Sequence, residues 1–223
     1  MIVHLPITIL FALAAASFGQ VPVAAQTVAA SPGQPAVTFS LDFPQSVPSH
    51  YSLKVMKDGQ ASYKSVGKLT PEAEGDPFSY AFTMSSGNVA RIFELAANVN
   101  YFEGDFDYKK GRQANTGKKT LAYEDATRHH ASDYNYSNHS NIQQITRLFQ
   151  SIATTIEFAR QLQYFHRYQP LALEQDLKRV EEMAKGNDLQ ELPAIAPVLR
   201  EIADDKSILN VTRARAMRLL SLP

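Results

Sequence analysis

Hydrophobic and polar residues alternate along several short stretches in the first half of the chain. Apolar side chains recur at every second position over residues 37–43, 51–55 and 78–84, and residues 120–124, Thr-Leu-Ala-Tyr-Glu, have the composition of another strand. Successive side chains of a strand point to opposite faces, so each stretch predicts a strand with one buried face. Asp58-Gly59 lies between alternating residues and favours a hairpin, because Gly readily adopts the positive φ of a tight turn. We therefore expect an antiparallel sheet of about four strands, with residues 65–77 as a loop.

The spacing of apolar residues becomes helical after residue 85. Positions 89, 92, 93 and 96 predict one helix across the sheet, with a Ser or Asn of residues 85–88 as its N-cap. A longer apolar stripe predicts an amphipathic helix over residues 141–168. The stripe comprises Ile142, Ile145, Phe149, Ile152, Ile156, Ala159 and Leu162. With further helices over about 171–185, 189–203 and 208–221, the expected fold is α+β: an antiparallel sheet of about four strands with one helix, followed by a C-terminal helical bundle.

The amino terminus has the features of an export signal. Residues 5–18 are apolar, but they are fewer than the roughly 20 residues that a membrane-spanning helix requires. Small residues at Val23 and Ala25 favour cleavage after Ala25, and Gly19 offers a second position. We expect a signal peptide at 1–25, a flexible lead at 26–36, an α+β domain at 37–140 and a helical region at 141–223 packed on it. The protein is then exported, to the periplasm or outside the cell.

Composition narrows the functions that the chain can have. Lys and Arg together number 22, as do Asp and Glu, so the net charge is zero. Nucleic-acid partners are excluded on this basis, because binding to phosphates needs a basic excess. The chain contains no Cys, which excludes disulfides, thiolate zinc sites and thiol nucleophiles. An exported protein of this composition must be stabilised by packing alone.

Two segments resemble known architectures. The Asp58-Gly59 hairpin, the helix at 89–96 and the pair Tyr101-Phe102 resemble an uncharacterised exported bacterial family over about residues 51–125. That resemblance implies a bacterial source and an exported location, and it implies no activity. Residues 189–221 are similar to a single helix pair of a HEAT-type repeat. Because one unit cannot form a solenoid, this resemblance implies a helical hairpin packed on the rest of the chain.

A histidine-rich segment is the strongest candidate for chemistry. Its ligand candidates are His129, His130, Asp133 and His139. Imidazole and carboxylate groups this close in sequence can bind zinc or another divalent metal. Their spacing matches no HExxH motif, and on a strand the adjacent histidines would point to opposite faces. The alternative is a polar loop between a strand and the long helix.

Aromatic residues are concentrated between residues 101 and 136. The candidates for a binding surface are Tyr101, Phe102, Tyr134 and Tyr136. Tyr is favoured at recognition surfaces because it offers a large ring and a hydroxyl at a small entropy cost. These rings would line a groove for a peptide or a glycan, and the alternative is that many of them belong to the core.

The sequence favours a binding function over a catalytic one. It contains no Gly-x-Ser-x-Gly nucleophile motif. We therefore expect an exported, non-catalytic protein that binds an envelope or extracellular protein and needs no cofactor. Two alternatives stay open: a metal-assisted hydrolase that uses the His129–His139 segment, and a structural or assembly protein whose helix at 141–168 pairs with a partner.

Overall fold

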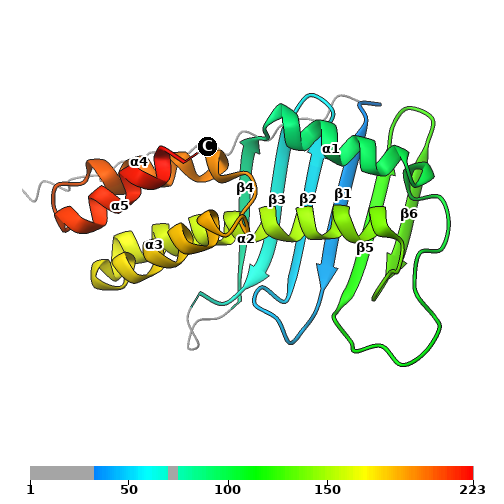
Figure 1. The fold of residues 1–223 in the computed structure, drawn as a ribbon, viewed down its shortest axis with the longest axis horizontal. Helices are drawn as coiled ribbons and strands as arrows, with labels where there is room; N and C mark the ends of the chain where they lie inside the picture. Colours follow the sequence, from blue (N-terminus) through cyan, green and yellow to red (C-terminus); the bar gives the residue numbers. More distant parts are fainter. Residues whose placement is uncertain (1–32, 70–74, 223) are drawn as a thin grey trace, which may run out of the picture. The chain divides into compact units, whose positions relative to one another are not determined.

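Six strands form one antiparallel sheet in the order β4-β3-β2-β1-β5-β6 (Figure 1). The computed structural model describes residues 33–69 and 75–222. The strands are β1 (Ala36–Asp42), β2 (His50–Met56), β3 (Gln60–Gly67), β4 (Asp76–Thr83), β5 (Lys118–Glu124) and β6 (His129–Tyr134). Strands β1 to β4 pair in chain order, whereas β5 pairs with the other edge of β1. The sheet therefore grows in both directions from β1.

One face of the sheet carries the hydrophobic core. Phe39, Leu53 and Leu121 point to this face and are completely buried. Residues of the opposite face are mostly small or polar and half-buried or exposed, and ion pairs such as Lys54–Glu124 at 2.5 Å lie on it. An antiparallel sheet with one face on the core and one face toward water requires the alternation seen in the sequence.

Helices cover the core face of the sheet and continue beyond it (Figure 1). The helices are α1 (Ser86–Ala97), α2 (Ser140–Tyr168), α3 (Pro170–Lys185), α4 (Ala196–Asp204) and α5 (Asn210–Leu220), with short 3-10 turns η1 (Asn100–Phe102) and η2 (Leu192–Ile195). Both α1 and α2 cross the strands, and Phe149 of α2 stacks on Phe39 with 5.4 Å between ring centroids. The Tyr80 hydroxyl donates to the Ala194 carbonyl at 2.8 Å and so links β4 to η2.

The α+β class is confirmed, and the number of strands is corrected. The sheet has six strands rather than about four. Strand β3 was expected only as the second half of the Asp58-Gly59 hairpin. The strand without any signal in the sequence is β6, for which we considered a metal site or a polar loop. Its core-facing residues are His130, Ser132 and Tyr134, so the apolar alternation is missing. Two helices, rather than one, lie across the sheet, because α2 also packs on it.

Several element boundaries also differ from those expected. Strand β3 ends at Gly67 and β4 begins at Asp76, so both extend into the expected loop at 65–77. The helix expected over 189–203 begins only at Ala196, because the preceding residues form η2. The long helix is confirmed as α2, and all seven residues of its apolar stripe are buried. The stripe is therefore occupied by the core and leaves no exposed seam for a partner helix.

The expected signal peptide at 1–25 lies outside the described residues, as does most of the flexible lead at 26–36. Strand β1 begins at Ala36, the last residue of that lead. Within residues 33–69 and 75–222, none of the helices combines the length and the apolar character needed to cross a bilayer.

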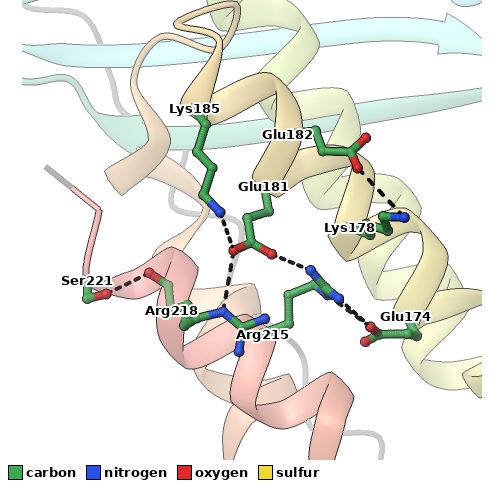
Figure 2. Close-up of polar contacts among 8 residues, drawn as sticks. All are labelled: Glu174, Lys178, Glu181, Glu182, Lys185, Arg215, Arg218 and Ser221. Atoms are coloured by element: carbon green, nitrogen blue, oxygen red, sulfur yellow. Dashed lines mark hydrogen bonds and ion pairs between the residues drawn. The ribbon is translucent and has the colours of Figure 1, made fainter.

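Ion pairs hold α5 against α3 (Figure 2). The Arg215 guanidinium donates to Glu174 at 2.8 and 2.9 Å and also pairs with Glu181. Glu181 is buried and additionally accepts from Lys185 at 2.9 Å and from Arg218 at 3.3 Å. The hydrogen bond from Lys185, followed by those from the two arginines, lowers the pKa of Glu181 to about 2. The central carboxylate of this cluster is thus fully paired with cations.

Candidate functional site

A cavity of about 520 Å³ lies between the first half of α2 and the β5–β6 edge of the sheet. Ligand sites commonly have volumes of about 300–1,000 Å³. The sheet side is lined by Lys119, Tyr134, Asn135, Tyr136 and Ser137, and the α2 side by Gln143, Thr146, Arg147 and Gln150. The α2 residues recur at steps of three and four and therefore share one face of the helix.

The strand register builds the floor of this site. Directly paired residues form one row across the core face: Ser65, Tyr51, Leu41, Lys119 and Tyr134. Directly opposite residues of antiparallel strands point to the same face, so the whole row faces α2. The row places a lysine in line with residues of the hydrophobic core.

Lys119 is buried, and none of its partners among the described residues is a carboxylate. Its ammonium donates to the carbonyls of Asn135 at 2.8 Å, Thr116 at 3.1 Å and Gly117 at 3.2 Å, and to the Thr116 hydroxyl at 2.9 Å. All four acceptors are neutral, and burial lowers the pKa of Lys119. Keeping a charge out of water without a counter-ion is unfavourable. An ionisable group in this state beside a cavity is a candidate for a functional role.

A second cation, Arg147, lies on the α2 side of the same cavity. Its side chain is exposed, and its only polar contact within the described residues is a long one, 3.4 Å to Gln143. Of the described residues that line the cavity, none is Asp or Glu. Two cations without a lining carboxylate make the cavity electropositive, so it suits an anionic group. The guanidinium fork of arginine matches a carboxylate with two hydrogen bonds.

The two tyrosines of the cavity have different roles. The buried Tyr134 donates to the Thr146 hydroxyl at 2.5 Å, and Thr146 in turn donates to the Ile142 carbonyl at 2.6 Å. This pair fixes β6 to α2. Tyr136 is 40% exposed, and its hydroxyl accepts from Gln143 at 3.2 Å. Tyr136 is therefore the aromatic ring of this cavity that a partner can reach.

A second cavity, of about 390 Å³, adjoins the first at Gln150. Tyr51 and Tyr63 form its floor, with 5.8 Å between their ring centroids. Glu157 of α2 accepts from the Tyr63 hydroxyl at 2.8 Å and from the Ser65 hydroxyl at 2.6 Å. We call the two adjoining cavities the α2 groove: it is electropositive near Arg147 and aromatic near Tyr51.

The aromatic residues singled out in the sequence lie in two separate places. Tyr134 and Tyr136 line the α2 groove, whereas Tyr101 and Phe102 lie in η1 and do not line it. Phe102 is completely buried in the core. The Tyr101 ring lies 4.5 Å from the Tyr123 ring and 3.9 Å from the Arg128 guanidinium.

The candidate metal ligands are also separated. His129 and His130 are neighbours on β6 and point to opposite faces. Asp133 accepts from Thr120 at 2.6 Å and pairs with Lys118 at 2.7 Å, and the His139 ring lies against Phe106. Within residues 33–69 and 75–222, no group of three or more His, Cys, Asp or Glu side chains is placed to hold a metal. The geometry therefore gives the metal-assisted hydrolase no support.

The cations of the groove were not singled out in the sequence. A signal for Lys119 was present, because it continues the alternation of Leu121 and Tyr123 and so occupies a core-facing position. A lysine at such a position is rare unless it is paired. Arg147 had no such signal, because an exposed arginine on an amphipathic helix is ordinary.

Sequence comparison assigns no relative. No protein-family model matches the chain, and no curated protein is significantly similar to it. The resemblances of residues 51–125 and 189–221 therefore stay predictions, and any functional assignment depends on the geometry of the α2 groove.

Proposed function

We propose that this chain is an exported, non-catalytic binding protein that holds a segment of an envelope or extracellular protein in the α2 groove. The observation that carries the proposal is Lys119, a buried ammonium in the wall of a cavity of about 520 Å³ that contacts only neutral oxygens within residues 33–69 and 75–222. A second cation, Arg147, and an accessible ring, Tyr136, line the same cavity. An anionic partner would supply the counter-charge that is missing from the described lining of this cavity.

The polar groups of the groove favour binding over catalysis. The donors of Lys119 are taken up by four neutral oxygens, and Glu157 accepts from two hydroxyls. None of the described residues that line the groove is a His or a Cys, so it holds neither a Ser–His nor a Cys–His pair. Groups that are already fixed by hydrogen bonds can position a ligand, but they are poorly placed to exchange protons with it.

Partner capture with matched tyrosine variants tests the proposal. Tyr136→Ala removes the accessible ring of the groove, and Tyr168→Ala removes a ring that is 61% exposed on the same chain but outside the groove. We expect the wild type and Tyr168→Ala to retain the same partner from an envelope extract. Tyr136→Ala should retain at least about tenfold less, because interface tyrosines often contribute 1–2 kcal/mol or more.

Two measurements make the result decisive. Thermal unfolding of both variants shows that a loss of the partner does not arise from a loss of the fold. Hydrogen exchange on α2, with and without the partner, shows whether the groove is covered. Equal retention by the three proteins, or a partner that leaves exchange on α2 unchanged, contradicts the proposal.

A further inference from the structure

The α2 groove differs along its length, and this difference indicates the chemistry of its ligand. The inference rests on the proposed function, because it names the kind of segment that the groove takes. At one end are Lys119 and Arg147, with no acidic residue among the described residues of that cavity. The other end contains one anion, Glu157, and one cation, Arg179. The net positive charge is therefore confined to one end.

The shape of the groove favours an extended chain. Its α2 side runs from Gln143 to Gln161, which is about 27 Å at 1.5 Å per helical residue. An extended peptide advances about 3.3 Å per residue, so about eight residues fill this length. Figure 1 shows that α2 crosses the strands, so a ligand beside it would also cross them.

The α2 side of the groove carries polar side chains along its whole length, between apolar ones such as Ile142 and Phe158. The residues Gln143, Gln150, Thr154 and Gln161 recur along the face of α2 that lines it. Side-chain amides offer both donors and acceptors, which is what a peptide backbone requires. Gln143 and Thr154 already donate to neighbouring groups, whereas the amides of Gln150 and Gln161 make no side-chain hydrogen bond among the described residues. A hydrocarbon chain laid over these two amides would leave them without partners, which is unfavourable. Apolar surface is present in both cavities, from Ile142 and the tyrosine rings in the first and around Tyr51, Val47 and Pro48 in the second.

We propose that the α2 groove binds an extended peptide of about eight residues, whose carboxylate lies beside Arg147 and Lys119 and whose apolar side chain contacts Tyr51. Arg147 supplies the direct hydrogen bonds, because its guanidinium has donors to spare. The Lys119 donors are already used, so its contribution is the attraction of its charge. The carboxylate comes either from a chain terminus or from an Asp or Glu side chain.

Three pools of random eight-residue peptides test this inference and identify the source of the carboxylate. The first has free carboxyl termini and no acidic residues; the second is amidated and free of acidic residues; the third is amidated and contains one Asp or Glu. Each is incubated with the purified protein, and the retained peptides are identified by mass spectrometry. We expect retention from the first or the third pool, and little from the second.

Affinities of the retained peptides for two arginine variants complete the test. Arg147→Gln removes the guanidinium of the groove, and we expect affinity to fall about tenfold to a hundredfold, as for the loss of a charged hydrogen bond. Arg167→Gln is the matched control on the same helix, outside the lining of either cavity. It should bind as the wild type does.

The outcomes separate this inference from the proposed function. Equal retention of the amidated, acid-free pool, or an unchanged affinity of Arg147→Gln, overturns the carboxylate assignment and leaves binding by the groove intact. No retention from any pool overturns the peptide assignment itself. In that case the partner capture with Tyr136→Ala still decides whether the groove is a binding site.

Discussion

Buried charge is arranged in opposite ways in the two regions of this molecule. In the helical region, Glu181 and Arg215 lie in a cluster where each has partners of opposite charge (Figure 2). At the edge of the sheet, the oxygens that accept from Lys119 in the described part of the chain are all neutral, and they lie beside a cavity of about 520 Å³. The first arrangement joins two helices and leaves little charge for a ligand. The second leaves a charge that a ligand can neutralise.

The largest expected effect concerns the helical cluster. Arg215→Met removes the guanidinium that joins Glu174 to Glu181, leaving two carboxylates of low exposure with fewer partners. Breaking a buried ion pair on one side typically costs about 3–5 kcal/mol, and we expect about 3 kcal/mol in the free energy of unfolding, measured with urea. The control Lys178→Met breaks the exposed Lys178–Glu182 pair, which should cost less than about 1 kcal/mol. Equal losses in both variants would contradict a structural role for the cluster.

Low pH should weaken the stabilising effect of the same cluster. The pKa of Glu181 is lowered from 4.5 to about 2 in the folded chain, so its contribution to stability is complete above pH 4.5. Between pH 4.5 and about 2, the unfolded chain binds a proton at this carboxyl group and the folded chain does not, so the falling pH favours the unfolded state. Stability should therefore fall over this range more steeply in the wild type than in Glu181→Gln. Parallel curves for the two proteins, from denaturant titrations at each pH, would be evidence against this.

A smaller change is expected at the sheet edge. Lys119→Met removes a donor from three carbonyls, but it also relieves the burial of an unpaired charge. We expect the two effects to offset in part, so that the free energy of unfolding is about 1–2 kcal/mol lower than in the wild type. A loss as large as that of Arg215→Met would show that Lys119 is mainly a structural residue.

The pH dependence of that variant gives a second, independent readout. Burial lowers the pKa of Lys119 in the folded chain. As the pH rises toward the ordinary value of 10.5, the folded chain therefore loses this proton at a lower pH than the unfolded chain does. The wild type should therefore gain stability relative to Lys119→Met over that range. A difference between the two proteins that does not change with pH would mean that Lys119 is not held in an unfavourable environment.

The smallest expected effect on stability is at Arg147. Its side chain is exposed, so Arg147→Gln should change the free energy of unfolding by no more than about 0.5 kcal/mol. The same variant should show the largest loss of peptide affinity. In the α2 groove, the variant that changes peptide affinity most should change the free energy of unfolding least. The helical cluster should show the opposite, because its charges stabilise the fold. A strongly destabilised Arg147→Gln would remove the distinction.

Local patterns predicted those parts of the fold whose own residues carry the signal. The helix at 141–168 was correct to within one residue, because seven apolar side chains repeat along it. Strand β6 was missed because His130, Ser132 and Tyr134 face the core from the edge of the sheet, where polar residues are tolerated. Of the expected binding residues, Tyr136 is an exposed ring of the groove and Phe102 belongs to the core, a difference that no spacing revealed.

What the sequence by itself determined was the period of most elements, β6 excepted, and the face that each of them buries. These are local properties, because alternation and helical spacing act between near neighbours. Tertiary structure alone decided which distant groups meet. Ser85, within the segment 85–88 expected to cap α1, has no side-chain capping bond of its own, and Glu191 accepts from both its amide and its hydroxyl at 2.8 Å.

The electropositive cavity arose in the same way. Strand register placed Lys119 beside Tyr134, and the packing of α2 brought Arg147 to the same cavity. Neither pairing follows from the local pattern of residues, since the first depends on the register of β5 with β6 and the second on how α2 packs against the sheet. The sequence thus determined most strands and helices and most of the core, whereas the cavity with its buried ammonium formed only when these elements packed together.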